Sequence, residues 1–361
     1  MKVFHEKIII ETIKKMNKKL LIGLTLEELK TIVTDFGMPS YTAKQIAEWL
    51  YKKRVLSINE MTNISSKNRA LLNEKYKVGR SEPLQVTISK DGTKKYLFAT
   101  ENNHFIETVL IPEENRVTLC VSSQAGCKMN CLFCMTGKQG FVSKLSAGEI
   151  LNQILSVPEA SEITNLVFMG MGEPFDNTMA VLTALEILTA DYGYAWSPHR
   201  ITVSTIGLIP GMKLFLEKTN CHLAISLHSP FHEERLQLIP AEKAYPIKKI
   251  LEELKKYDFS KQRRLSFEYI MFDHFNDTMR HARELVKLLK EIPCRVNLIR
   301  FHAIPDVPLK TSSEEKILSF RNYLNENGII ATIRKSRGED IFAACGMLST
   351  SAKEKETKNQ L

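Results

Sequence analysis

The sequence predicts an α/β protein in which a parallel sheet follows a basic helical module. From about residue 117 onward, apolar strand-like runs alternate with helical stretches, a pattern typical of βα units whose strands are covered by helices. Before that point, short amphipathic helices give way to runs with a period of two, which indicate paired strands. The length of 361 residues and the hydrophobic content of 43% are sufficient for one large core and an accessory module.

Residues 1–83 are predicted to form the basic helical module. Thr25 and Glu28 are spaced as in a capping box, which marks the start of a first helix. Further helices are expected at 42–54, with Trp49 on the inner side, and at 65–76.

Residues 84–116 are predicted to form a short β linker. After Pro83 the period changes to two, and Asp91-Gly92 is a turn signal for a hairpin. The expected strands are 84–89, 94–100 and 104–111.

Residues 117–335 are predicted to form the parallel sheet and its helices. The expected strands are 117–121, 163–169, 200–205, 221–227, 265–271, 295–301 and 329–334. The expected helices are 146–157, 177–190, 208–219, 246–257, 277–291 and 312–327. This pattern fits a complete or partial barrel, or an open doubly wound sheet. The motifs described below follow strands, where barrel enzymes carry their chemistry, and this favours the barrel.

The positive charge is concentrated at the start of the chain. The net charge is +9, and the first hundred residues hold 19 Lys and Arg against 10 Asp and Glu, so they account for all of it. A basic module indicates a polyanionic partner such as nucleic acid, although a solvated basic surface is the alternative. The candidate phosphate contacts are Lys52, Lys53, Arg54, Lys67, Arg69 and Lys75.

The cysteines and the apolar runs bear on location. No apolar run is long enough to cross a bilayer, and the first residues do not resemble a secretory signal. Seven cysteines without an export signal form a poor disulfide framework and a better metal-binding or catalytic set. We therefore expect a cytoplasmic protein without a membrane anchor. Residues 336–361 form the C-terminal segment, and SAKEKETKNQL at its end is expected to be a disordered tail.

The strongest chemical signal is Cys127-Lys-Met-Asn-Cys131-Leu-Phe-Cys134, in the loop after the first strand of the parallel sheet. Three thiolates at this spacing can hold three irons of a [4Fe–4S] cluster and leave the fourth iron open to a substrate. A structural zinc site normally has four ligands, and Cys120 lies within an apolar strand, which makes it a poor fourth. Zinc and three unrelated thiols remain the alternatives.

The C-x3-C-x2-C spacing at the head of a βα barrel resembles the radical S-adenosylmethionine (SAM) superfamily. The sequence is most similar to RlmN-type methyltransferases, which act on carbon 2 of adenine in RNA. The resembling segments are FIETVLIPEENRVTLCVSSQAGC (105–127), MGMGEP (169–174), STIG (204–207), SLH (226–228) and RGEDIFAACG (337–346). The resemblance implies a partial (βα)6 barrel of the TIM type and a cluster that is held by Cys127, Cys131 and Cys134 and exchangeable with SAM.

The resemblance also implies a set of SAM contacts. These residues are Gly172, Glu173, Ser204, Ser226, Leu227, His228 and His302. Each also has a local interpretation, because glycines form tight turns and a Ser or His at a strand end often makes only local hydrogen bonds. His302, in VNLIRFHAIP, stands where the family usually has Asn, and unlike Asn it can carry charge near neutral pH.

Three further residues acquire roles from the resemblance. Cys345 would carry a methyl group taken from one SAM, and a second SAM would yield the radical that removes a hydrogen from it. Cys120 would then form a transient disulfide with Cys345 and release the product. Glu107 would take the proton from the attacked carbon. The alternatives are a buried apolar thiol at Cys345 and, at Glu107, a polar side chain on the wet face of an edge strand.

The implied substrates are an adenosine in the peptidyl-transferase region of 23S rRNA and the adenosine next to the anticodon of tRNAs. Extracting such a base into a pocket agrees with a basic module that holds phosphates. We expect a monomer that depends on an electron-donating reductase. Two alternatives remain. The Cfr type methylates carbon 8 of the same adenine, and 196–210 and 226–235 look similar to it. The other is a zinc-bearing RNA-binding module without catalysis.

Overall fold

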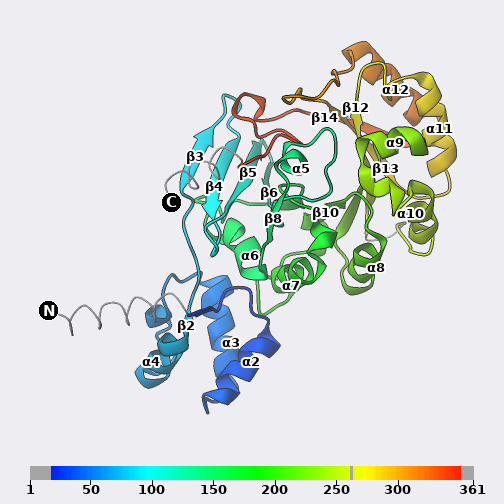
Figure 1. Cartoon of the computed structure of the whole chain (residues 1–361). Helices are drawn as coiled ribbons and strands as arrows, with labels where there is room; N and C mark the ends of the chain where they lie inside the picture. Colours follow the sequence, from blue (N-terminus) through cyan, green and yellow to red (C-terminus); the bar gives the residue numbers. More distant parts are fainter. Residues whose placement is uncertain (1–17, 261–262, 351–361) are drawn as a thin grey trace. The chain divides into compact units, whose positions relative to one another are not determined.

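The computed structural model describes residues 18–260 and 263–350 (Figure 1). The chain divides into two compact units. The N-terminal unit comprises Met1–Ser81, Ser146–Ser156 and Thr183–Trp196, and the barrel unit comprises Glu82–Leu145, Val157–Leu182 and Ser197–Leu361. The predicted division into module, linker, barrel and C-terminal segment stays a prediction, and the tail SAKEKETKNQL lies outside the described residues.

The N-terminal unit contains short helices and a small parallel strand pair. Its elements are β1 (Lys19–Leu20), α2 (Leu26–Asp35), α3 (Thr42–Ala47), α4 (Ser66–Lys75), β2 (Tyr76–Lys77) and α6 (Ala147–Leu155). The predicted capping box is confirmed, since Thr25 N–H donates to Glu28 Oε2 at 2.7 Å and Glu28 N–H donates to Thr25 Oγ1. The prediction of one helix over 42–54 was wrong in detail. A π-helical turn over Glu48–Lys52 follows α3, and Trp49 is only half-buried.

Three of the six candidate phosphate contacts have partners within this unit. Arg69 donates to the carbonyls of Met61 and Ile64 at 3.2 and 3.1 Å. The ammonium groups of Lys53 and Lys75 lie 3.8 and 5.0 Å from the ring centroids of Trp49 and Phe36. Lys52 and Lys67 are exposed. Binding of RNA phosphates by this unit therefore stays a prediction. Of the six candidate residues, Lys52 and Lys67 are the best placed to make such contacts.

The core of the barrel unit is a ten-stranded sheet in the order β14-β13-β12-β11-β10-β9-β6-β5-β4-β3. Neighbours from β6 to β14 are parallel, which confirms the predicted parallel sheet. In the described residues β14 pairs only with β13, so the barrel is partial. The parallel strands are β6 (Arg116–Cys120), β9 (Asn165–Phe168), β10 (Ile201–Thr205), β11 (His222–Ser226), β12 (Leu265–Met271), β13 (Arg295–Arg300) and β14 (Ile330–Arg334).

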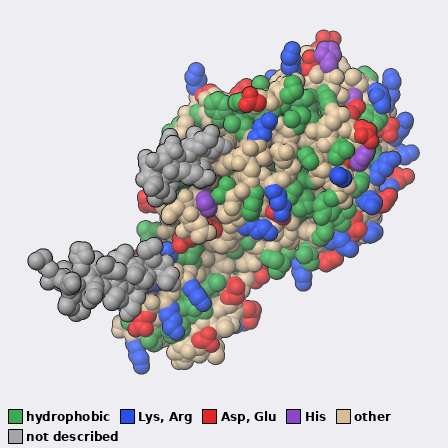
Figure 2. Space-filling view, in the orientation of Figure 1, with side chains coloured by type: hydrophobic (Ala, Val, Ile, Leu, Met, Phe, Trp, Pro, Cys, Tyr) green, Lys and Arg blue, Asp and Glu red, His purple; other side chains and the backbone are tan. Residues whose placement is uncertain are grey.

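Helices follow the parallel strands, as predicted. They are α7 (Thr178–Thr189), which both units share, α8 (Ile209–Lys218), α10 (Ile247–Leu254), α11 (Met279–Leu289) and α12 (Glu314–Glu326). The sequence did not predict the short α9 (His232–Leu238), nor the hairpin of β7 (Gln124–Gly126) and β8 (Phe141–Lys144). Both charge signs are interspersed on the face of the barrel unit seen in Figure 2, in line with 31 residues of each sign after residue 100.

The predicted β linker is part of the barrel sheet. Its strands are β3 (Gln85–Ile88), β4 (Lys94–Ala99) and β5 (Phe105–Glu113), and β5 pairs antiparallel with both β4 and β6. The turn at Asp91-Gly92 is confirmed, since Ser89 N–H donates to the carbonyl of Thr93 at 2.8 Å.

This hairpin also holds the C-terminal segment. Gly338 N–H donates to Asp91 Oδ2 at 3.0 Å, and the Ser89 hydroxyl donates to Asp340 Oδ1 at 2.5 Å. Burial alone would raise the pKa of Asp91, but hydrogen bonds from Thr93 and Gly338 lower it to about 2. The carboxylate of Asp91 is therefore ionised at neutral pH and fixes the loop that leads to Cys345.

Candidate active site

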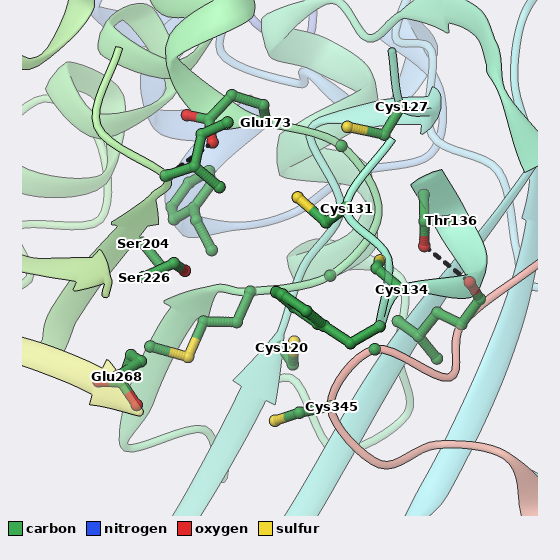
Figure 3. Close-up of a pocket in the computed structure, with 18 of the residues that line it drawn as sticks. Cys120, Cys127, Cys131, Cys134, Thr136, Glu173, Ser204, Ser226, Glu268 and Cys345 are labelled. Carbon is green, nitrogen blue, oxygen red and sulfur yellow. Dashed lines mark hydrogen bonds between the residues drawn. The ribbon is translucent and has the colours of Figure 1, made fainter. Parts of the chain in front are cut away.

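A cavity of about 170 Å³, here called the cysteine cavity, lies at the carboxyl ends of the parallel strands (Figure 3). It brings together most of the predicted site residues from six separate segments of the chain. They are Cys120, Cys127, Cys131, Cys134, Gly172, Glu173, Ser204, Ser226, His228 and Cys345. The side chains of Leu227, His302 and Glu107 do not line this cavity in the described structure.

The three-cysteine loop runs between β7 and β8 and includes α5 (Met135–Gln139). Gly126 enters it with φ +69°, and a Cβ atom there would lie 1.9 Å from the carbonyl oxygen of Gly140. Backbone hydrogen bonds fix the loop, because Cys127 N–H donates to Gly140 at 3.0 Å and Met135 N–H donates to Gly346 at 2.8 Å. The second bond joins the cysteine loop to the segment that carries Cys345.

The thiols of this loop are buried in a way that suits metal ligation. Burial raises the pKa of Cys127 to about 12, and burial together with repulsion between the thiolates raises the pKa values of Cys131 and Cys134. Binding to iron replaces the proton and compensates the buried charge. In the described part of the chain, no three His, Cys, Asp or Glu side chains converge on one metal ion. A cluster does not need such convergence, because each thiolate binds a different iron.

These residues therefore fit a [4Fe–4S] cluster with one open iron. They do not fit a single zinc ion, which needs its ligands around one point.

Glu173 is buried and lines the cysteine cavity on the side away from Cys120 and Cys345. Its Oε1 accepts hydrogen bonds from Phe175 N–H at 2.9 Å and the Thr205 hydroxyl at 2.7 Å, and its Oε2 accepts one from Ile206 N–H at 3.0 Å. Burial nevertheless raises its pKa to about 7. An ammonium group would relieve this cost, so the carboxylate suits the amino group of an amino-acid ligand.

The Gly172 position is explained by packing. With φ +95°, a Cβ atom there would lie 2.5 Å from Cβ of Gln124. A glycine is therefore required here by the close approach of Gln124, while contact of Gly172 with SAM stays a prediction.

Two hydroxyls and one imidazole complete the wall of the cysteine cavity. Within the described ranges, the hydroxyls of Ser204 and Ser226 have no protein hydrogen-bond partner and face the cavity, which leaves them available to a ligand. His228 has a structural role, because its Nδ1 accepts a hydrogen bond from Ile270 N–H at 3.0 Å. Its ring lies edge-on to Phe133 at 4.7 Å, and burial lowers its pKa to about 3. His228 is therefore neutral and supports the cysteine loop.

A second cavity of about 480 Å³, here called the lumen cavity, occupies the interior of the partial barrel. Cys345 and Arg334 line both cavities, whereas Cys120 lines only the cysteine cavity. His302 lines only the lumen cavity, where its Nδ1 lies 3.1 Å from Glu339 Oε1. Leu227 is fully buried, and its carbonyl accepts a hydrogen bond from Arg235 Nε at 3.1 Å.

Cys120 and Cys345 lie next to each other in the cysteine cavity, and Cys345 also lines the lumen cavity. Figure 3 shows their side chains next to each other, on the side of the cavity away from Cys127. Both are free thiols; Cys120 is buried at the end of β6 and Cys345 is exposed. Burial and the nearby charge of Cys345 raise the pKa of Cys120 to about 12. The fold thus brings together two cysteines that are distant in the sequence, and their roles stay predicted.

Arg334 and Glu268 were missed by sequence reasoning. Arg334 ends β14, and the negative charge of a Cys345 thiolate, followed by that of Glu268, raises its pKa. Its Nη1 lies 3.2 Å from Met169 Sδ and 3.9 Å from Glu268 Oε2. The signal available in the sequence was position alone, because each residue lies near the carboxyl end of a parallel strand.

Glu107 lies outside both cavities. The alternative of an edge strand with a wet face was wrong, because β5 has partners on both sides and Glu107 is 7% exposed. Lys95 Nζ lies 2.9 Å from its Oε1, and Ser349 N–H donates to its Oε2 at 3.0 Å. Burial raises the pKa of Glu107, and the nearby charge of Lys95 lowers it in part. The segment around Ser349 therefore covers the carboxylate.

The partial barrel, the three-cysteine loop and the cavity beside it define a radical SAM protein. A family model described as the radical SAM superfamily matches residues 121–289. A second model, described as the ribosomal RNA large subunit methyltransferase N-terminal domain, matches residues 19–78.

Similar proteins identify the family. "Probable dual-specificity RNA methyltransferase RlmN" of Parabacteroides distasonis is 59% identical over 335 residues, which cover 93% of this chain and 98% of that protein. The "Dual-specificity RNA methyltransferase RlmN" of Syntrophus aciditrophicus is 42% identical and covered to 99%. A radical SAM methyltransferase structure from Sphaerobacter thermophilus is 39% identical, with a TM-score of 0.85 over 91% of this chain and 98% of that one. The chain therefore belongs to the RlmN family of RNA methyltransferases.

Family membership confirms the predicted fold class and a SAM-dependent RNA methyltransferase activity, and it excludes the non-catalytic zinc module. A [4Fe–4S] cluster and SAM are the cofactors of the superfamily, and the substrate is RNA. Among the helices of the described residues, none is long and apolar enough to cross a membrane.

The geometry of Gly126 yields a test of the cysteine loop. Gly126→Ala should prevent most cluster assembly, because the new Cβ collides with the Gly140 carbonyl and displaces Cys127. Gly140→Ala is the matched control. It has a similar φ of +81°, but a Cβ there meets nothing within 4 Å. Iron per chain and visible absorption after anaerobic reconstitution measure the outcome. Equal iron loss in both variants would show that φ strain, and not the collision, governs the loop.

Proposed function

We propose that this chain methylates carbon 2 of one adenosine in the peptidyl-transferase region of 23S rRNA, and of the adenosine next to the anticodon in tRNAs. The observation that carries the proposal is that Cys120 and Cys345 lie next to each other in the cysteine cavity, and that Cys345 also lines the lumen cavity. Two thiols in this place suit a covalent route in which one carries the methyl group and the other releases the product. The names of the relatives, dual-specificity RNA methyltransferases, support two RNA substrates.

In this proposal Cys127, Cys131 and Cys134 hold the cluster, which when bound supplies the electron that cleaves SAM. Glu173 binds the amino group of SAM, and Gly172, Ser204 and Ser226 line its site. Leu227 supports that site through its backbone carbonyl, which Arg235 holds, and His228 supports it by packing against Phe133 of the cysteine loop. His302, on the lumen cavity, would contact SAM only at the boundary of the two cavities.

The protein residues then act in sequence, with two SAM molecules used per turnover. The Cys345 thiolate attacks the methyl carbon of the first SAM and displaces S-adenosylhomocysteine, so that the methyl group becomes bound to sulfur. After the radical from the second SAM has removed a hydrogen atom from that methyl group, the carbon adds to carbon 2 of the adenine. The adduct then gives up the carbon-2 proton and one electron, for which the bound cluster would be the acceptor. Glu107 receives the proton, which requires the segment around Ser349 to move away from it.

Release of the product uses the second cysteine. The Cys120 thiolate attacks the Cys345 sulfur, the sulfur–carbon bond breaks with its electron pair left on carbon, and that carbon takes a proton and becomes the methyl group. The two cysteines end as a disulfide, which an external thiol or reductase must reduce before the next turnover. Such reductive recycling suits a protein in the cytoplasm, where thiols and reductases are available. A monomeric state stays part of the proposal.

The RNA product tests the proposed function directly. A strain without its own enzyme, complemented with this gene, should contain 2-methyladenosine in both 23S rRNA and tRNA, as measured by mass spectrometry of nucleosides. Detection of 8-methyladenosine would contradict the carbon-2 assignment and favour the Cfr type. Methylation of rRNA alone would contradict the second substrate.

The two cysteine roles are tested by trapping. Cys120→Ala should accumulate a covalent protein–RNA adduct, because the Cys345–carbon bond forms but cannot be broken. Adding Cys345→Ala to this variant should abolish the adduct while iron content stays unchanged. Cys294→Ala is the matched control, since Cys294 lines neither cavity and should retain methylation. An adduct that persists without Cys345 would refute its role as carrier.

A further inference from the structure

The interior of the partial barrel is unusually open and polar. Barrel interiors are normally filled by layers of branched apolar side chains. Here the lumen cavity has a volume of about 480 Å³, against about 170 Å³ for the cysteine cavity. Small or polar side chains from five strands line it: Thr118, Thr202, Ser266, Asn297 and Thr332. The open lumen follows from this choice of residues, because none of them can fill it.

The charge of the lumen cavity is strongly positive. Arg116, Arg264 and Arg295 line its far end, where β6, β12 and β13 begin. Lys335 and Arg337 line it nearer to Cys345, and its carboxylates are Glu113 and Glu268. Basic side chains from separate segments thus converge on one cavity with few acidic groups to balance them.

The three arginines at the far end lack acidic partners. Within the described ranges, none of them forms an ion pair with a carboxylate, and Arg116 Nε donates only to the Thr118 hydroxyl at 3.0 Å. Burial, followed by the nearby charges of Arg295 and Arg116, lowers the pKa of Arg264. The Nε of Arg337, on the same cavity, is buried without a hydrogen-bond partner. Like charges held together in this way cost free energy that a bound anion would recover.

The lumen cavity also connects these arginines with Cys345. Arg116 and Cys120 are the first and last residues of β6, so they are separated by about 13 Å at the usual rise of a strand. A short stretch of single-stranded RNA spans this distance. The cavity wall includes Cys120's partner Cys345 at one end and Arg116 at the other.

We propose that Arg116, Arg264 and Arg295 bind phosphate groups of the RNA strand that adjoins the target adenosine, with the lumen cavity as the path from these phosphates to Cys345. The inference rests on the proposed function and adds a binding site to it. The same arginines could bind a free nucleotide, and this source of phosphate is distinguished in the test below. RNA is favoured because the chain is an RNA methyltransferase and the cavity reaches the acceptor cysteine.

The test compares RNA binding by reconstituted enzyme in which two arginines are neutralised. Arg264→Gln/Arg295→Gln should weaken binding of a tRNA anticodon hairpin about tenfold, as measured by fluorescence anisotropy, because two phosphate contacts are lost. The slope of log affinity against log salt should fall by about one unit for each contact. The conservative Arg264→Lys/Arg295→Lys variant should recover most of the slope, since it keeps both charges.

Controls separate this inference from folding and from the proposed function. Arg283→Gln/Lys290→Gln removes two exposed charges on the outer α11 and its end and should leave RNA affinity unchanged. Cleavage of SAM by dithionite-reduced enzyme without RNA should be equal in all variants, which reports an intact cysteine cavity. Unchanged RNA affinity and salt slope in the glutamine variant would overturn the proposal. The proposal would also be overturned if the glutamine variant lost AMP binding but kept RNA binding, because the arginines would then form a pocket for a free nucleotide. The carbon-2 assignment is tested separately by the RNA product.

Discussion

The site depends on the burial of three cysteine thiols on one short loop. Left as thiols they are forced into the protonated state, as the pKa of about 12 for Cys127 indicates, and only a metal group makes them useful as charged ligands. The loop can bury them because Gly126 allows its backbone to pass against Gly140. Around this loop the parallel strands present Glu173, Ser204 and Ser226, so the proposed sites for the cluster and for SAM lie in one cavity.

In the proposed mechanism, the C-terminal segment supplies the cysteine through which the methyl group is transferred. It is tied to the cysteine loop through the bond from Met135 to Gly346, and to the β3–β4 hairpin through Asp91 and Gly338. These bonds place Cys345 beside Cys120 in the cysteine cavity, at a position where Cys345 also lines the lumen cavity. The antiparallel strands β3 to β5 therefore do more than link consecutive parts of the chain. Their hairpin fixes the C-terminal segment, which carries Cys345. The same segment covers Glu107, the proposed proton acceptor. In the proposed mechanism this segment must therefore move before Glu107 can reach the RNA.

Sequence reasoning succeeded where a signal is local and failed where it depends on distant contacts. The strands from β6 to β14 could be predicted because their apolar runs are long, and the cysteine spacing identified the cluster loop. The three-residue β7 and the short α9 carry too little pattern to be seen. An exposed position of Glu107 on an edge strand was one interpretation of the sequence, because neither strand carries a pattern that predicts the pairing of β5 with β6. Arg116, Arg264 and Arg295 are far apart in the sequence, and only the closure of the sheet brings them to one cavity.

The central claim is that the methyl group reaches RNA through Cys345 and loses one of its original hydrogens on the way. The most direct measurement supplies SAM with a trideuterated methyl group and determines the deuterium content of the methylated adenosine by mass spectrometry. The account predicts a product with two deuterium atoms and one solvent-derived hydrogen, because one deuterium is abstracted before transfer and a proton is added at release. A product that retains all three would show direct polar transfer from SAM to RNA and would contradict the account.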